Sequence, residues 1–228
     1  MNKKIDIAGL QLDNCTVRES IMLLERAMSE QSFFSIAEIN MDTILRAETD
    51  ERVKEAVQRL NHTIIAEENI LRAVDCCTMQ RQHEIADGTF FYELMKRVER
   101  NHLSVCLLGE TQDATLSMQS LILERFPRMN IVDVEILEQC TGELDNVINE
   151  INIKTPDVVV SLLPSPEQEY FFLDYRDKIF AKLWYAMGTE KPAEHKSRIA
   201  AFFNEKKRLR ILLRHLTKYQ EQEASKDE

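Results

Sequence analysis

Apolar, β-branched runs alternate along this chain with segments in which apolar residues recur every three to four positions. The clearest run, VVVSLL, covers residues 158–163 and stops at Pro164. After it, Ser165 is a predicted N-cap residue, Pro166 the first helical residue, and Gln168 the reciprocal partner in a capping box. This pattern predicts a strand that leads through a short loop into a helix, and open α/β sheets bind ligands at such strand ends.

The rest of the chain repeats this alternation. We expect strands at 5–12, 33–40, 62–66, 103–110 and 130–137, and helices that follow Thr16, Asp42, Asp113 and Ser165 or cover 53–60, 89–100 and 144–151. Residues 75–88 are polar and irregular, which favours a surface loop. Short connections between strands and helices predict an α/β fold, with a Rossmann-like, mainly parallel sheet and helices on both of its faces.

The spacing of apolar residues among Lys and Arg in the C-terminal region predicts a basic amphipathic helix. We place a domain boundary after Gly188, which gives an α/β domain at 1–188 and a helical appendage with a charged tail at 189–228. Such a helix either lies on an anionic bilayer and meets a lipid diphosphate, or docks on the sheet or on a partner like any amphipathic helix. The cations that would contact the membrane or the diphosphate are Arg208, Arg210 and Arg214.

The net charge and the composition exclude several classes of protein to which this chain could belong. The formal net charge of the 228 residues is -10, which argues against a nucleic-acid binder. No run approaches the roughly 20 apolar residues of a membrane-spanning helix, and the first residues lack a signal-peptide core, so we expect a cytoplasmic protein. There are only five glycines, few for a backbone loop that wraps phosphate. For the vicinal Cys76 and Cys77, ordinary free thiols are favoured over a redox or soft-metal site.

Several local motifs, in collinear order, resemble those of one known family. They are IAGLQLDNCTVRESI at 7–21, the strand ending in Asn40, ETDERVKEAVQRLN at 48–61, LLG at 107–109, RFPRMNIV at 125–132 and PDVVVSLLPSPEQE at 156–169. With them the chain resembles the WecG/TagA/CpsF family of bacterial glycosyltransferases over nearly its whole length. The resemblance implies transfer of a hexose, such as N-acetylmannosamine, from a UDP-sugar to a lipid-linked acceptor at the inner membrane face.

Three short segments depart from the family's sequence pattern. Ala66, Glu67 and Glu68 stand where the family has Pro-Asp-Gly, whose aspartate is the proposed catalytic base. Residues 84–87 (EIAD) replace an Arg-Val-Thr-Gly segment, and residues 110–113 (ETQD) replace a glycine-rich turn. Added carboxylates disfavour a diphosphate at short range. These departures support a second hypothesis, a catalytically inactive member that serves as a binding or scaffold module for a partner glycosyltransferase or the membrane.

Two residues at predicted strand ends are candidates for the chemistry. The resemblance implies that Glu67 is the catalytic base, and a carboxylate in a partly desolvated cleft suits that role. The alternative is a solvated acidic cap beside Glu68 and Asn69. Asn40 either contacts the sugar or nucleotide or bonds its own turn.

The remaining candidates would bind the donor. A helix N-terminus at Ser165, Gln168 and Glu169 favours a polar or anionic ligand, although the same residues also serve as caps. Gly109 permits either a ligand to approach closely or a simple tight turn. The nucleotide sugar would be a substrate, so we expect no cofactor, and the scattered histidines suggest no metal site. Metal dependence and a protein partner or homo-oligomer stay open.

Overall fold

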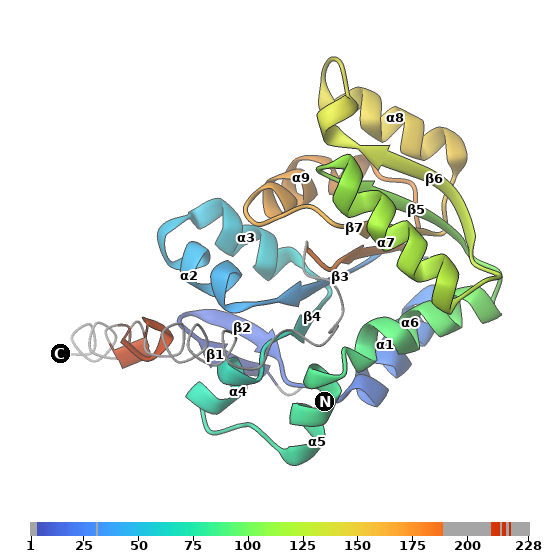
Figure 1. Cartoon of the computed structure of the whole chain (residues 1–228). Helices are drawn as coiled ribbons and strands as arrows, with labels where there is room; N and C mark the ends of the chain where they lie inside the picture. The colour runs from blue at the N-terminus through green and yellow to red at the C-terminus, as the bar shows by residue number, and fades with distance from the viewer. Residues whose placement is uncertain (1–3, 31, 189–210, 215, 218, 220–228) are drawn as a thin grey trace.

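The computed structural model describes residues 4–30, 32–188, 211–214, 216–217 and 219. Within these residues, six parallel strands form a sheet in the order β4-β3-β8-β7-β5-β6, and β1 and β2 form a separate antiparallel hairpin (Figure 1). The strands are β1 Lys4–Ile7, β2 Leu10–Asp13, β3 Phe34–Ile39, β4 His62–Ile65, β5 Ser104–Gly109, β6 Asn130–Ile136, β7 Val158–Ser161 and β8 Leu183–Ala186. The expected α/β fold with a parallel, Rossmann-like sheet is confirmed.

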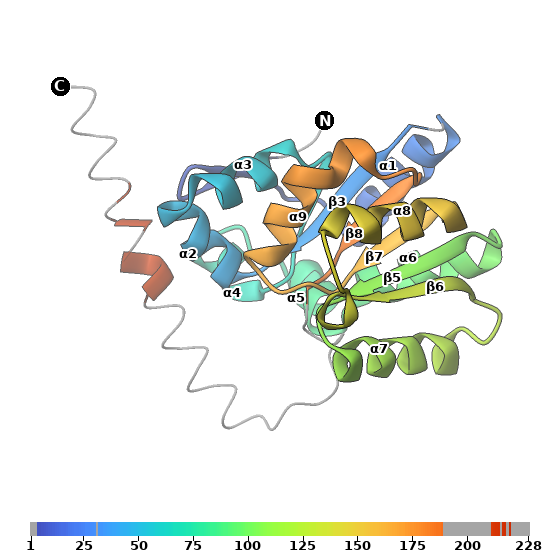
Figure 2. The ribbon, with the colours of Figure 1, turned by 90° about the horizontal axis from the view of Figure 1, so that it is seen from above.

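Helices cover both faces of the sheet, as expected. Their bounds are α1 Val17–Ser29, α2 Met41–Thr49, α3 Glu51–Arg59, α4 Glu68–Ala73, α5 Met79–Ala86, α6 Thr89–Arg100, α7 Gln112–Arg125, α8 Leu144–Lys154 and α9 Glu167–Tyr175, with 3₁₀ turns at Leu137–Gln139 and Arg176–Lys178. One core lies between the sheet and α2, α3, α8, α9 and the hairpin, and the other lies between the sheet and α1, α6 and α7. Figure 2 shows α9 and α7 on opposite sides of the strands.

The strands supply side chains to both cores in alternation. On β8, Leu183 and Tyr185 belong to the core under α1, α6 and α7, whereas Trp184 and Ala186 belong to the core under α3 and α9. Successive side chains of a strand point to opposite faces, and both faces are covered here. All four residues of β8 are therefore buried, which explains why such strands are continuous apolar runs in the sequence.

Two segments differ from the sequence-based expectation. Residues 5–12 form the β1–β2 hairpin, which turns at Ala8 and Gly9 with φ of 53° and 80°, rather than one strand of the main sheet. The alternating pattern of a strand and of a tight hairpin is the same, so the pattern could not separate them. Residues 75–88 are not a loop, because α5 forms there and the side chain of Thr78 caps it.

The predicted helix starts are correct in part. The capping box of Thr16 and Glu19 is confirmed at the start of α1. Asp113 does not cap α7, which starts after Thr111, and Asp42 does not cap α2. Both aspartates lie in the first turn of their helices, where a carboxylate interacts favourably with the helix dipole.

The connections after β3 and β4 begin on the same face of the sheet. The chain after β3 continues into α2 and α3, and α4 after β4 buries Ile70 and Leu71 in the same core before the chain reaches the other face at α6. Open α/β sheets place ligands at the carboxyl ends of their strands. The edge formed by β3 and β4 is therefore the first place to look for a site.

Candidate active site

The ends of β3 and β4 bring Asn40 and Glu67 together. The two strands pair in parallel with Ile39 opposite Ile65, so the residues that follow each strand emerge at the same edge. The backbone N–H of Met41 donates a hydrogen bond to Oε1 of Glu67 at 2.9 Å. This bond fixes the half-buried carboxylate beside the first turn of α2.

Glu67 occupies the N-cap position of α4, but its side chain does not cap that helix. The carboxylate turns to α2 instead. Glu67 thus caps the neighbouring helix α2 rather than α4, and its role as the catalytic base stays a prediction. A carboxylate held in one place at a strand end is suited to accept a proton from a ligand hydroxyl.

Asn40 is the N-cap residue of α2. Its Oδ1 accepts hydrogen bonds from the backbone N–H of Thr43 at 2.9 Å and from the hydroxyl of Thr43 at 3.1 Å. The interpretation that Asn40 bonds its own turn is thus confirmed. This cap also orients the side chain at the edge that carries Glu67, and contact between the Asn40 amide and a ligand stays a prediction.

The segment before α9 differs from the expected capping box. The helix begins at Glu167, the N-cap position belongs to Pro166, and the peptide bond between Ser165 and Pro166 is cis. No side chain caps this helix start, so the predicted capping box is wrong. Because the helix begins one residue later than expected, Ser165 lies outside it. Oε1 of Gln168 accepts a hydrogen bond from the backbone N–H of Gly188 at 3.2 Å, which ties α9 to the end of β8.

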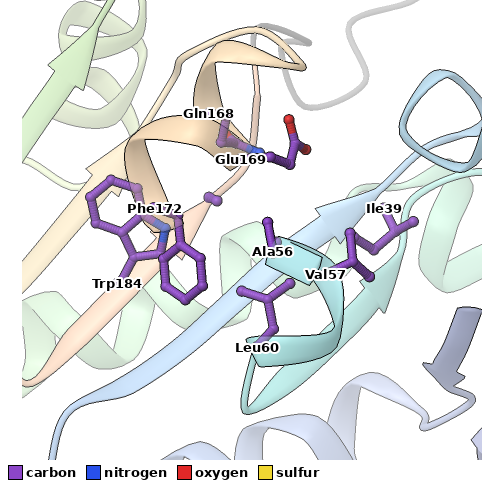
Figure 3. A pocket seen from close by; sticks show the side chains of 10 residues that line it. Ile39, Ala56, Val57, Leu60, Gln168, Glu169, Phe172 and Trp184 are labelled. Carbon is purple, nitrogen blue, oxygen red and sulfur yellow. The ribbon is translucent and has the colours of Figure 1, made fainter. Parts of the chain in front are cut away.

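Glu169 is a buried carboxyl group, 5% exposed, on the first turn of α9. Burial raises the pKa of Glu169 above its usual range, although the nearby Ser165 hydroxyl and the charge of Arg46 act in the opposite direction. Glu169 lines a small cavity of about 10 Å³ together with Ile39 and apolar side chains of α3, β8 and α9 (Figure 3). Since Ile39 precedes Asn40, the start of α9 lies against the strand end that leads into α2.

Packing within the protein accounts for Gly109 at the end of β5. A side chain at this position would meet Oγ1 of Thr115 at 1.8 Å, and Thr115 is fully buried on α7. The close approach expected at Gly109 is therefore made by a helix of the same chain. Strands β8 and β7 separate β5 from β3, so Gly109 does not lie beside Asn40 and Glu67. A contact between Gly109 and the donor stays a prediction.

Reasoning from the sequence missed Arg81, a buried cation on α5 that is 5% exposed. Its Nη1 donates a hydrogen bond to Oε2 of Glu84 at 2.8 Å, and the same oxygen accepts one from the backbone N–H of Val17 at 3.1 Å. Both side chains line a cavity of about 40 Å³ that also touches Ala66, the residue before Glu67. We call this cavity the Arg81 pocket. The sequence signal for this pair is the i, i+3 spacing of Arg81 and Glu84. That spacing indicates a contact only if the segment is a helix, which the sequence does not predict here.

The basic C-terminal residues are described only in part. Arg208 and Arg210 lie outside the described residues, whereas Arg214 is described and exposed. On the same helical segment Leu212 is fully buried and Leu216 is 9% exposed, and both belong to the core that includes the β1–β2 hairpin. Figure 1 shows the segment beside β1 and β2. These two leucines therefore contact the protein, as in the docked-helix interpretation.

Three further observations bear on metal binding, membrane insertion and the state of the cysteines. Within the part of the chain that the structure describes, no cluster of three or more histidine, cysteine or acidic side chains is arranged to hold a metal ion. Among the helices of the same described residues, none is long and apolar enough to cross a membrane. Cys76 and Cys77 are free, half-buried thiols that pack against the core under α2 and α3.

The parallel sheet, with an amide and a carboxylate at its carboxyl edge, defines an α/β protein with a candidate site at its strand ends. The Glycosyl transferase WecG/TagA/CpsF family matches residues 5–215, and the chain belongs to that family. Its relatives include proteins of Staphylococcus aureus strains MRSA252 and NCTC 8325 / PS 47, both named N-acetylglucosaminyldiphosphoundecaprenol N-acetyl-beta-D-mannosaminyltransferase. They are 22% and 21% identical over 187 residues, which is 81% of this chain and 73% of each relative.

Proposed function

We propose that this chain is an active glycosyltransferase that transfers a hexose of the N-acetylmannosamine type from a UDP-sugar to a lipid-linked acceptor in cell-surface polysaccharide synthesis. The observation that carries the proposal is the anchored carboxylate of Glu67, which the Met41 N–H holds at 2.9 Å beside Asn40. Family membership supports the reaction class. The names of the relatives support the sugar and an acceptor of the N-acetylglucosaminyl diphosphoundecaprenol type.

In this mechanism Glu67 acts as the general base. Its carboxylate takes the proton of the acceptor hydroxyl while the hydroxyl oxygen attacks the anomeric carbon of the donor. The bond between that carbon and the diphosphate oxygen breaks, and UDP leaves with the bonding electron pair. The new glycosidic bond joins the sugar to the acceptor, and the proton stays on Glu67 until solvent removes it.

The other candidate residues bind the two substrates. Side chains at the strand ends and at the start of α9 would hold the donor, and these are Asn40, Gly109, Ser165, Gln168 and Glu169. The cations of the C-terminal helix would meet the acceptor's phosphates and an anionic membrane surface, and these are Arg208, Arg210 and Arg214. The enzyme would then act as a peripheral protein on the inner membrane face. Proton transfer by Glu67 needs no resident cofactor.

A transfer assay tests the proposal. Purified protein is incubated with UDP-N-acetylmannosamine and a detergent-dispersed N-acetylglucosaminyl diphospholipid, with either magnesium or EDTA present. We expect acceptor-dependent release of UDP together with a lipid product one sugar larger. Release of no UDP under either metal condition, from protein that remains folded, would contradict the proposal.

A further inference from the structure

A cleft lies at the amino edge of the sheet, opposite the edge that carries Glu67. Leu103 and Lys182 line it, and these residues come immediately before β5 and β8. The C-terminal halves of α1 and α6 supply the rest of its lining. We call this space the amino-edge cleft. Its volume is about 410 Å³, which lies within the range of sites for small molecules.

The apolar part of this lining is continuous with the core. It consists of Leu24 and Met28 of α1, Leu94 and Val98 of α6, and Leu103. The first, third and fourth of these side chains are buried in the core under α1, α6 and α7, and the other two pack against it. A ligand with an apolar body would cover this surface, and removing apolar surface from water favours binding.

The cleft also has a cationic rim. Among the described residues that line it, three are cations, Arg97, Arg100 and Lys182, and one is a carboxylate, Glu25. Nε of Arg97 donates a hydrogen bond to Oε1 of Glu25 at 2.8 Å. Nη2 of Arg100 lies 3.8 Å from the same oxygen, beyond hydrogen-bond distance, and the Arg100 side chain is 67% exposed. The two arginines therefore share one carboxylate, and the second of them is held weakly.

Ion pairs position the other two cations without using all their donors. Arg97 also bonds Glu93, and Nζ of Lys182 lies 2.7 Å from Oδ1 of Asp157; neither acid belongs to the described lining of the cleft. A guanidinium has five N–H donors and an ammonium has three, so further donors remain for a ligand. The helix dipoles disfavour an anion at these C-terminal ends, but Arg97 and Arg100 on the last turn of α6 oppose that effect.

We propose that the amino-edge cleft is a second ligand site, which binds a small organic anion with an apolar body. The apolar body lies against the core side chains, and the anionic group accepts charge-assisted hydrogen bonds from Arg100 and Lys182. Glu25 opposes binding, because it competes for the guanidinium groups and repels the anion. This site is independent of the transfer reaction proposed at Glu67.

Fluorescence titration tests the site with two probes that share one aromatic framework. They are 8-anilinonaphthalene-1-sulfonate and N-phenyl-1-naphthylamine, which lacks the sulfonate. We expect the wild type to bind one equivalent of the sulfonate. Saturating UDP should leave this affinity unchanged, because the cleft and Glu67 lie at opposite edges of the sheet. Displacement of the sulfonate by UDP, or binding that does not saturate, would overturn the inference.

Four variants locate the bound probe. Arg100→Gln should weaken sulfonate binding at least fivefold, and Glu25→Gln should strengthen it at least threefold, with the affinity for the neutral amine unchanged in both. Met28→Trp fills the cleft and should weaken both probes at least fivefold. Arg26→Gln is the matched control, because it removes a cation of α1 that is 80% exposed and outside the lining. It should leave both affinities unchanged.

Two results from these variants would overturn the inference. The first is wild-type affinity for the sulfonate in both Arg100→Gln and Met28→Trp, which would place the probe elsewhere on the protein. The second is equal weakening in Arg100→Gln and Arg26→Gln, which would show an effect of net charge alone.

Discussion

Oε1 of Glu67 and the backbone N–H of Met41 lie 2.9 Å apart, in a hydrogen bond that joins the end of β4 to the start of α2. The orientation of the carboxylate thus depends on two neighbouring strands rather than on the residues beside it in sequence. The resemblance placed an aspartate of the family at this position. The longer side chain of glutamate reaches across to the adjacent strand end, so the substitution is compatible with an anchored base.

Gly109 is required by the packing of α7 on β5. Gly109→Ala would place a methyl group 1.8 Å from Oγ1 of Thr115, so one of the two elements must move. We expect a loss of about 3 kcal/mol in the free energy of unfolding, the upper range for overpacking a core. Urea denaturation measures it, and Thr115→Ala in the same chain should restore part of the loss. A loss below about 0.5 kcal/mol would contradict this packing account.

Asp13 and His62 form a buried polar pair that joins the hairpin to β4. Oδ2 of Asp13 lies 3.4 Å from Nδ1 of His62 and accepts the backbone N–H of Thr63 at 3.0 Å. Burial raises the pKa of Asp13, but the adjacent His62 ring and the hydrogen bond from the Thr63 N–H outweigh it, so the net pKa is lowered below the usual 3.8.

A carboxyl whose folded pKa is lowered stabilises the protein above its unfolded pKa and loses that contribution as the pH falls. The wild type should therefore lose more unfolding free energy than Asp13→Asn between pH 5 and pH 3. At pH 7 the variant should be less stable by about 2 kcal/mol, because it removes the charge from a buried network. Denaturant titrations at the three pH values measure both effects. Parallel pH dependence of the two proteins would contradict a lowered pKa at Asp13.

Glu169 should have the opposite pH dependence. Its folded pKa is raised, so its ionisation destabilises the protein as the pH rises above the usual 4.5. Glu169→Gln removes this charge and should raise the free energy of unfolding at pH 7.5 by about 1 kcal/mol. The gain should disappear near pH 4, where both side chains are neutral. An equal gain in unfolding free energy at both pH values would show that packing, rather than the charge of Glu169, causes the stabilisation.

The C-terminal helical segment is held by its apolar side. Leu212 is fully buried, whereas its neighbour Leu213 is 43% exposed. Leu212→Ala should therefore release the segment, and trypsin should cleave after Arg214 at least fivefold faster than in the wild type. Leu213→Ala is the matched control and should be cleaved at the wild-type rate. Equal cleavage of the two variants would show that the segment is not docked through Leu212.

Much of the fold is predictable from the sequence, because covered parallel strands are apolar runs and helices repeat their apolar residues every three to four positions. Residues 89–100 were expected as a helix and form α6. The hairpin at 5–12 was missed because alternation is the same for a strand and for a hairpin. The sequence does not predict α5 because this helix has no apolar stripe. Most of its residues are polar, and its buried residue is the cation Arg81.

The site was less predictable, because it depends on contacts between distant segments. Glu67 and Asn40 were identified as strand-end residues, but nothing near Glu67 in the sequence indicates a bond to Met41. The space beside Gly109 is filled by Thr115 of the following helix, which a local motif does not show. Arg81 and Glu38 come from a helix and a strand that meet only in the folded chain, at the Arg81 pocket.

The most direct test of the central claim compares turnover in Glu67→Gln and Glu68→Gln. Both variants remove one negative charge, but Glu68 pairs with Arg72 on the outside of α4. We expect Glu67→Gln to lower kcat by at least 10³-fold while binding UDP as tightly as the wild type, since the loss of a general base affects only the transition state. Glu68→Gln should retain most of the activity. Wild-type kcat in Glu67→Gln would show that Glu67 is not the base.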